Sequence, residues 1–157
     1  MGKETQGMNI VLVQPEIPPN TGNIARLCAA TGIPLHLVGP LGFRMTDSRV
    51  RRAGLDYWDS VKITRYASLE EFLRPIPEAR LFFFSKRATT SYTEARYQEG
   101  DFLVFGSETR GLPEWVMEEY HHRLFTIPML RPEVRSLNLS NAVAIVCYEA
   151  LRQIGKV

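Results

Sequence analysis

The chain has 157 residues, which suits one α/β domain and is too short for a core plus a separate substrate domain. Its 45% hydrophobic and 23% charged residues are typical of a soluble folded protein, and no apolar run approaches the roughly 20 residues of a membrane span. The formal net charge of +2 neither favours nor excludes a nucleic-acid partner. We expect one domain over residues 8–157, after a frayed extension over residues 1–7 that lacks the apolar centre of a secretory signal.

The first part of the chain alternates apolar runs with amphipathic segments. Residues 8–14 form a β-rich apolar run, which predicts a buried strand. A helix is expected over 20–31, where Gly32 stops it, and a second strand over 34–38. The Arg-rich residues 46–53 predict a short, solvated helix.

The middle of the chain continues this alternation. Residues 60–66 favour a weak strand, and the capping box over 68–71 opens a helix that Pro75 closes. The aromatic apolar runs 80–85 and 101–105 are typical of interior strands that are buried on both faces.

The last part predicts a helix over 113–120, a strand over 123–127 and a long helix over 139–154. Apolar residues recur in the long helix with a 3.6-residue period, and Gly155 can end it in a left-handed conformation. Its candidate N-terminal caps are Ser136, Asn138, Ser140 and Asn141.

The alternation of strands and helices predicts an α/β fold with a mostly parallel sheet and helices on both faces. The last helix has a second apolar row, Ala144, Ile145 and Tyr148, which makes its apolar surface wider than packing on one core requires. Either the helix is deeply buried in its own domain, or this row packs on a second copy of the chain. In such folds ligands bind beyond the C-terminal strand ends.

Cysteine and histidine provide little evidence for a metal or covalent site. Cys28 and Cys147 fall on apolar faces of predicted helices without a Cys or His at ligand spacing, so buried thiols in a reducing cytoplasm are favoured over a disulfide or a metal. His36, His121 and His122 form no set with a nucleophile, and no carboxylates have metal-ligand spacing. We expect neither a metal nor a covalent intermediate.

Residues 106–113 follow a buried strand and open a helix, where backbone N–H groups can converge on a ligand. The segment lacks the Lys-Ser/Thr ending of a P-loop and the glycine spacing of a dinucleotide turn, which disfavours nucleotide phosphate binding. The structural alternative is a tight strand-to-helix turn with a capping glutamate.

Motifs in three parts of the chain resemble those of the SpoU branch of the SPOUT RNA methyltransferases. In chain order they are residues 20–26, 105–113, and 127–129 together with 136–143. Residues 15–28 and 51–57 are similar to the compact TrmL type, which methylates a ribose 2′-hydroxyl at the tRNA wobble nucleotide. The resemblance extends from residue 8 to about residue 155.

The resemblance implies a C-terminal deep trefoil knot, an exception to the rule that chains avoid knots. It also implies a homodimer, with Tyr148 at the interface, which takes S-adenosylmethionine and tRNA as substrates and releases S-adenosylhomocysteine. An apolar slot with backbone donors suits such a cofactor. The cofactor-binding residues implied by the family pattern are Phe84, Gly106, Ser107, Glu108, Ile127, Met129, Ser136 and Leu137.

The same resemblance assigns Arg26 to the reacting hydroxyl. A guanidinium is a poor base in water, so either Arg26 is perturbed when RNA excludes water, or it stabilises the developing alkoxide while another group takes the proton. A phosphate or ion-pair role is the alternative. Asn20, Ser140 and Asn141 are further catalytic candidates, and these residues, like Glu108, could equally be structural supports.

Basic residues in three regions are candidates for contacts with RNA phosphates, although a run of arginines is more often a solvated face. They are Arg44, Arg49, Arg51, Arg52, Lys86, Arg87, Arg131 and Arg135. Two other functions remain open: a 2′-O-methyltransferase for another tRNA or ribosomal RNA site, and a non-catalytic RNA-binding factor with the knotted fold.

Overall fold

The computed structural model describes residues 7–157, so the expected fraying of residues 1–6 lies outside the described part. Gly7, which we assigned to the same extension, is held in the fold because its carbonyl accepts a 2.6 Å hydrogen bond from the Gly100 backbone N–H. Every helix within residues 7–157 is too short or too polar to cross a bilayer.

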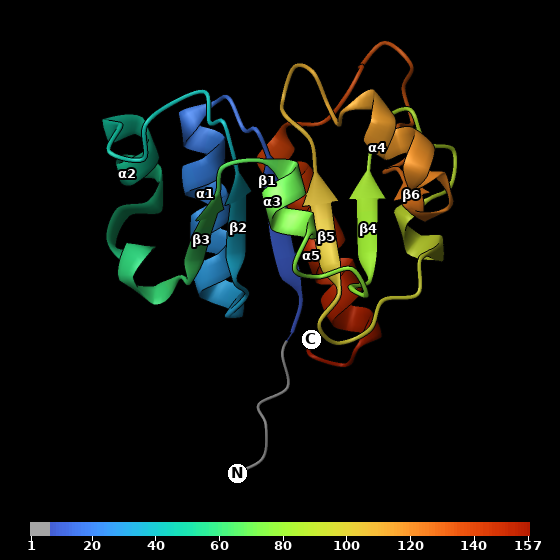
Figure 1. The fold of residues 1–157 in the computed structure, drawn as a ribbon, viewed down its shortest axis with the longest axis horizontal. Helices are drawn as coiled ribbons and strands as arrows, with labels where there is room; N and C mark the ends of the chain where they lie inside the picture. Colours follow the sequence, from blue (N-terminus) through green and yellow to red (C-terminus); the bar gives the residue numbers. More distant parts are fainter. Residues whose placement is uncertain (1–6) are drawn as a thin grey trace.

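Among the described residues, six strands form one entirely parallel sheet in the order β3-β2-β1-β5-β4-β6 (Figure 1). They are β1 (Asn9–Val13), β2 (Leu35–Val38), β3 (Ile63–Tyr66), β4 (Leu81–Phe84), β5 (Phe102–Phe105) and β6 (Leu124–Phe125). At the centre, Ile10 of β1 is in register with Leu35 on one side and Leu103 on the other. Strands β2 and β3 lie on one side of β1, and β5, β4 and β6 lie on the other, which creates a switch point between β1 and β5.

The helices lie on both faces of the sheet, as expected (Figure 1). They are α1 (Pro18–Thr31), α2 (Ser48–Gly54), α3 (Leu69–Leu73), α4 (Glu114–Glu119) and α5 (Leu139–Gln153), with the short 3₁₀ helices η1 (Leu55–Ser60), η2 (Tyr92–Glu94) and η3 (His121–Arg123). The three 3₁₀ helices were not predicted, because segments of three to six residues are too short to show a periodic apolar pattern.

Two apolar cores flank the sheet. On one face α1 and α5 bury Ile24 and Val146 against the strands, and on the other α3 and α4 bury Phe72 and Val116. Each of the four residues of β4 is buried, and three of the four of β5 are, which confirms the prediction of strands covered on both sides. This arrangement leaves the C-terminal strand ends at one edge of the molecule.

Several boundaries differ from the prediction. Helix α1 begins at Pro18 instead of residue 20, because Pro18 and Pro19 fit a first turn that needs no backbone N–H donor. It ends as predicted at Gly32, where φ is +70°. Strand β6 is only two residues long, since the N–H of Thr126 instead bonds to the Thr90 carbonyl at 2.8 Å.

Both cysteines are unpaired and fully buried in the core that α1 and α5 form. Burial raises the pKa of Cys147 to about 12 and that of Cys28 further still. A thiol kept protonated in this way is a poor nucleophile. The prediction that both thiols are buried is confirmed.

Candidate active site

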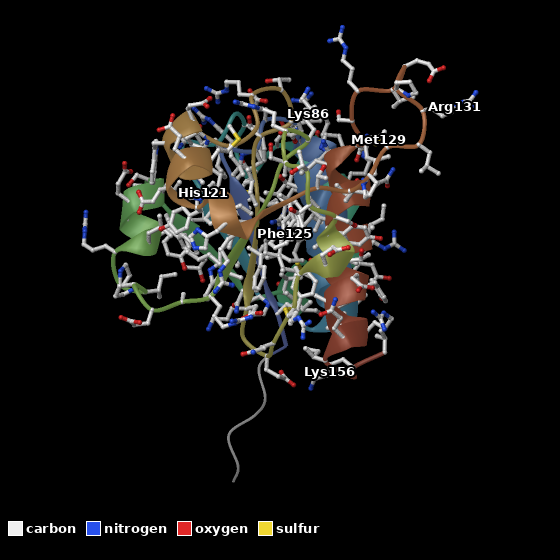
Figure 2. All side chains as sticks on the ribbon, turned by 90° about the vertical axis from the view of Figure 1, so that its right-hand side faces the viewer. Lys86, His121, Phe125, Met129, Arg131 and Lys156 are labelled. Carbon is white, nitrogen blue, oxygen red and sulfur yellow. The ribbon has the colours of Figure 1, made fainter. Side chains whose placement is uncertain are left out.

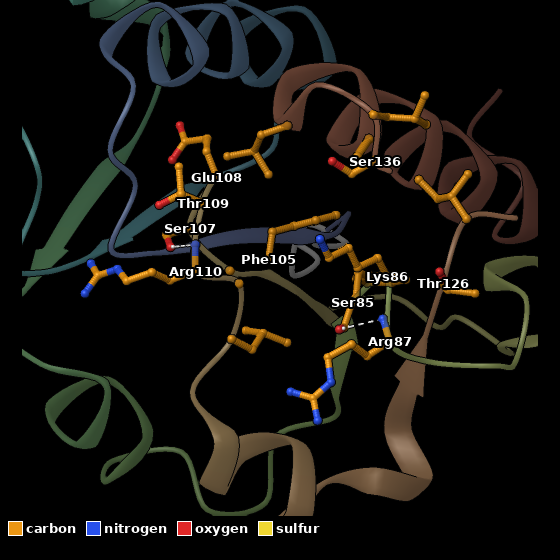
Figure 3. Close-up of a pocket in the computed structure, with 18 of the residues that line it drawn as sticks. Ser85, Lys86, Arg87, Phe105, Ser107, Glu108, Thr109, Arg110, Thr126 and Ser136 are labelled. Carbon is orange, nitrogen blue, oxygen red and sulfur yellow. Dashed lines mark hydrogen bonds between the residues drawn. The ribbon is translucent and has the colours of Figure 1, made fainter. Parts of the chain in front are cut away.

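A pocket of about 460 Å³ opens at the C-terminal edge of β4, β5 and β6. Figure 3 shows side chains from four separate segments surrounding it: residues 85–87, residues 105–110, Thr126 and Ser136. The volume is within the roughly 300–1,000 Å³ of small-molecule sites. The position beyond the strand ends is the one that the fold class predicts.

Aromatic and aliphatic side chains form the inner wall of the pocket. The rings of Phe84 and Phe105 are nearly parallel, with centroids 4.9 Å apart, and both side chains are largely buried. Ile127, Leu137 and Leu139 line the pocket from the segment that leads into α5. The result is an apolar slot with a peptide backbone along its rim.

Gly106 allows the loop after β5 to turn tightly. A Cβ atom at this position would lie 2.3 Å from the Gly111 carbonyl carbon and 2.4 Å from the Leu112 nitrogen, so no larger residue fits without a backbone shift. Ser107 and Gly111 exchange two backbone hydrogen bonds across the loop, and the Ser107 hydroxyl accepts from the Arg110 N–H at 3.1 Å (Figure 3). The loop is therefore a rigid wall of the pocket.

Glu108 connects this loop to the start of α1. Its carboxylate accepts hydrogen bonds from the backbone N–H groups of Glu16 at 2.7 Å and Ile17 at 3.0 Å, and from the Asn20 side-chain amide at 3.1 Å. Ile17, the N-cap of α1, makes no side-chain cap of its own. The expected capping glutamate is thus present, but it supports α1 instead of the following helix α4.

Glu16 makes the reverse connection. Its carboxylate accepts from the Thr109 hydroxyl at 2.6 Å and the Thr109 N–H at 3.0 Å, and it lies 3.5 Å from the Arg110 guanidinium. The Thr109 hydroxyl, more than any other neighbour, holds the pKa of Glu16 below its usual value. Glu16 and Glu108 with these partners form a carboxylate clamp between the loops that follow β1 and β5.

The segment between β6 and α5 closes the pocket from the other side. Residues 131–138 are exposed throughout, and Figure 2 shows Arg131 on the part that projects furthest. The chain enters α5 at Asn138, whose Oδ1 accepts from the Ser140 N–H at 2.9 Å and from its hydroxyl at 2.6 Å. Of the four candidate caps, Asn138 is therefore the one used.

The structure brings most of the predicted site residues together. The eight that the family pattern assigns to the cofactor all line the pocket, and Asn20 lies at its edge. Ser140 and Asn141 are in the first turn of α5, outside the pocket lining. Arg26 also lies outside it, exposed on α1.

The predicted basic residues divide into two regions. Lys86, Arg87 and Arg135 line the pocket, and Lys86 and Arg131 lie at the same end of the molecule in Figure 2. Arg87 is paired with Glu114 at 3.0 Å. The other predicted residues, Arg44, Arg49, Arg51 and Arg52, lie on α2 and in the turn before it.

Sequence reasoning missed several residues that line the pocket. Phe105, Met117, Leu139 and Ala142 contribute apolar surface, and Thr126 contributes a hydroxyl. Phe105, Leu139 and Ala142 lie within the motifs but have the same residue types as core positions, so a periodic pattern cannot separate them from the core. Among residues 7–157 there is no group of three potential metal ligands.

Comparison with known proteins identifies this arrangement. The model of the SpoU rRNA methylase family matches residues 7–148. The chain belongs to the SpoU methylase family. The resemblance seen in the three motifs is thereby confirmed, and S-adenosylmethionine dependence follows for the chain as a member of this family.

Curated relatives in the family are similar over nearly their whole length. The tRNA (cytidine(34)-2′-O)-methyltransferase of Escherichia coli K12 is 50% identical over 149 residues, which is 94% of either chain. The protein of the same name from Aeromonas hydrophila is 49% identical over 150 residues, with 94% of this chain and 95% of that one covered.

Solved structures of SpoU methylases share the fold. One that concerns 2′-OH methylation of C/U34 on tRNA superposes with a TM-score of 0.90 at 50% identity, covering 94% of this chain and 96% of that one. The rRNA methyltransferase of Sinorhizobium meliloti, solved with S-adenosylmethionine bound, gives a TM-score of 0.83 at 25% identity. The superposition covers 97% of this chain and 58% of that one. The α/β class with a parallel sheet is therefore that of the family.

Proposed function

We propose that this chain transfers the methyl group of S-adenosylmethionine to the ribose 2′-hydroxyl of nucleotide 34, the wobble position, in tRNA. Relatives that are about 50% identical over 94% of the chain have this activity in their names. The single observation of the structure that supports it is the convergence of all eight family-pattern residues on one pocket. S-adenosylhomocysteine is the expected product.

The residues of the pocket fit this cofactor. The Phe84 and Phe105 slot and the side chains of Ile127 and Leu137 suit an adenosine and a methionine chain, and the rigid loop at Gly106 presents backbone groups beside them. No Lys-Ser/Thr phosphate grip is present in this loop. When bound, the cofactor supplies an electrophilic methyl group. Phe84, Gly106, Ser107, Glu108, Ile127, Met129, Ser136 and Leu137 would hold it.

We also propose that the C-terminal segment forms the deep trefoil knot of the SPOUT fold. Residues 126–138 cross the pocket entrance between β6 and α5, and α5 then packs on the α1 face of the sheet. A threaded segment would fix the pocket wall that contains Ser136. Residues 8–157 would form a single domain that works in the cytoplasm with its tRNA.

A homodimer would complete the site. Ile145 and Tyr148 on α5 are 37% and 45% exposed, although the opposite face of the same helix is fully buried. We assign this exposed row to a second copy of the chain. Arg26 is outside the pocket of its own subunit, so in this arrangement it would act at the pocket of the partner subunit.

In the proposed mechanism Arg26 touches the reacting ribose. Methyl transfer from sulfur to oxygen is a direct displacement, so the protein must align two atoms and stabilise charge that develops on the oxygen. Five guanidinium N–H donors can do this without loss of a proton from Arg26, and the proton of the 2′-hydroxyl passes to water. The clamp of Glu16 and Glu108 ties the start of α1 to the pocket loop, which gives Asn20 a supporting instead of a chemical role.

Nucleoside mass spectrometry tests the reaction. Undermethylated tRNA is incubated with the protein and S-adenosylmethionine, and anticodon variants and a 2′-deoxy nucleotide at position 34 serve as controls. We expect one methyl group on the ribose of nucleotide 34 and none on the deoxy substrate. A methyl group on a base, or on ribosomal RNA alone, would contradict the proposal, and absence of cofactor binding would favour the RNA-binding factor.

A further inference from the structure

Three arginines outside the pocket lie over aromatic rings instead of beside carboxylates. Arg123 lies over the buried ring of Phe82, whereas Arg26 and Arg51 lie over two rings of η1. The Arg26 guanidinium carbon is 5.2 Å from the centroid of the Tyr57 ring, and that of Arg51 is 5.1 Å from the Trp58 ring. Neither arginine has an acidic partner among the side chains that the structure describes. The two rings are neighbours in η1, which packs against α1 and α2.

Several other arginines are already paired with carboxylates. Arg49 pairs with Asp47 at 2.9 Å, and Arg152 pairs with Glu149 at 2.9 Å. In such pairs the N–H donors that a ligand would need are partly occupied. An aromatic ring holds a guanidinium by its face and leaves the N–H edges free for hydrogen bonds.

The two aromatic side chains are held differently. Trp58 is fixed because its Nε1–H donates to the Arg51 carbonyl at 3.2 Å. Tyr57 is 41% exposed, and among the described residues its hydroxyl has no hydrogen-bond partner, so the contact with Arg26 is the interaction that orients the ring. The Tyr57 ring lies outside the apolar cores, so it is available to hold a cation by its face.

We propose that Tyr57 and Trp58 are positioning residues for RNA: Tyr57 aims Arg26 at the target ribose, and Trp58 aims Arg51 at an adjacent phosphate. The inference rests on the proposed function and deepens it. It also ranks the basic residues of this region, because Arg51 keeps its donors free whereas Arg49 does not. The partner is an unpaired RNA segment, whose ribose and phosphate oxygens accept such donors.

The test compares Tyr57→Leu with Tyr57→Phe, and Trp58→Leu with Trp58→Phe. Each Phe variant keeps an aromatic face, and each Leu variant removes it. We expect Tyr57→Leu to lower kcat at least about tenfold, which is about 1.4 kcal/mol, with KM for tRNA nearly unchanged, because the contact acts on the reacting ribose. Trp58→Leu should instead raise KM and reduce the salt slope of tRNA binding by about one.

The controls separate positioning from folding. Trp115→Leu removes an aromatic residue of similar exposure, 40%, from α4 and should change kcat and KM less than about twofold. Both Phe variants should retain activity within about threefold, and calorimetry should show unchanged S-adenosylmethionine affinity in all five variants. If Tyr57→Leu does not fold, Tyr57→Gln, which suits an exposed position, takes its place.

Different outcomes identify different failures. If the wild-type protein binds no S-adenosylmethionine or methylates no tRNA, the proposed function is wrong. If the wild type is active and the Leu variants match it, only the positioning role is wrong. A loss that the Phe variants share would assign the effect to the tyrosine hydroxyl or the indole N–H, and would also overturn the inference.

Discussion

At the scale of single residues, His36 is a half-buried titratable group whose two ring nitrogens both have hydrogen-bond partners. It lies on β2, where its Nε2–H donates to Asn9 Oδ1 at 3.1 Å and the Tyr66 hydroxyl donates to its Nδ1 at 2.9 Å. The rings of Phe72 and Phe102 pack beside it. Neutral His36 satisfies both hydrogen bonds, so its role in this structure is a structural one.

Burial, with a smaller contribution from Lys62, lowers the pKa of His36 from 6.5 to about 4. Between these values the unfolded chain binds the proton and the folded chain does not. The stabilisation that neutral His36 contributes to the folded state is therefore fully present above pH 6.5, and it decreases as the pH falls toward 4. We expect the advantage of wild type over His36→Gln to shrink by about 2 kcal/mol between pH 7 and pH 4, after allowance for solvent screening. Urea unfolding at several pH values measures this, and parallel curves for the two proteins would contradict it.

At the scale of elements, the clamp is the main device that relates α1 to the pocket. Glu108 accepts three hydrogen bonds from residues about ninety positions earlier in the chain. No local pattern predicts such a contact, because capping rules describe residues within one turn of the helix end. The sequence singled out Glu108 only through its family motif and could not separate support from chemistry.

Replacement of Glu108 by Gln tests the clamp. The amide has one accepting oxygen where the carboxylate has two, so at least one N–H at the start of α1 loses its partner. We expect the free energy of unfolding to fall by about 1–3 kcal/mol and S-adenosylmethionine to bind more weakly. Glu78→Gln, at an exposed position, is the matched control and should change neither quantity. Equal stability of the two variants in urea would show that the clamp does not hold the loops.

Gly106 offers a second test at this scale. A Cβ 2.3 Å from the Gly111 carbonyl carbon forces the loop between β5 and α4 to move. We therefore expect Gly106→Ala to weaken cofactor binding at least about tenfold in calorimetry. Gly7→Ala, whose Cβ would meet only the Ile33 side chain at 3.9 Å, is the control. Unchanged affinity in Gly106→Ala would mean that this loop does not form the cofactor wall.

At the scale of the whole molecule, the strands, the main helices and their two-sided burial could be predicted because apolar period and run length reflect local sequence. The pocket followed from strand ends and family motifs. The 3₁₀ helices, the pairing of Glu16 with Thr109 and the rings over Arg26 and Arg51 could not be predicted, since each depends on contacts between distant segments. Whether these contacts form depends on where each segment lies relative to the sheet, and residue type alone does not reveal that.

An active site shared between two subunits, as proposed above, needs Arg26 of one copy at the pocket of the other. Arg26 is on α1, outside the pocket that contains Gly106. In a dimer of one Arg26→Ala subunit and one Gly106→Ala subunit, one of the two sites would combine an intact pocket with an intact Arg26 of the partner. Each variant alone is expected to be nearly inactive, and Arg26→Ala should still bind S-adenosylmethionine.

The decisive measurement is tRNA methylation by that mixed dimer, purified through different tags on the two subunits. We predict about half of the wild-type rate, because one site in two is complete. A mixed dimer no more active than either parent, or a wild-type protein that is fully active as a monomer, would contradict the shared site.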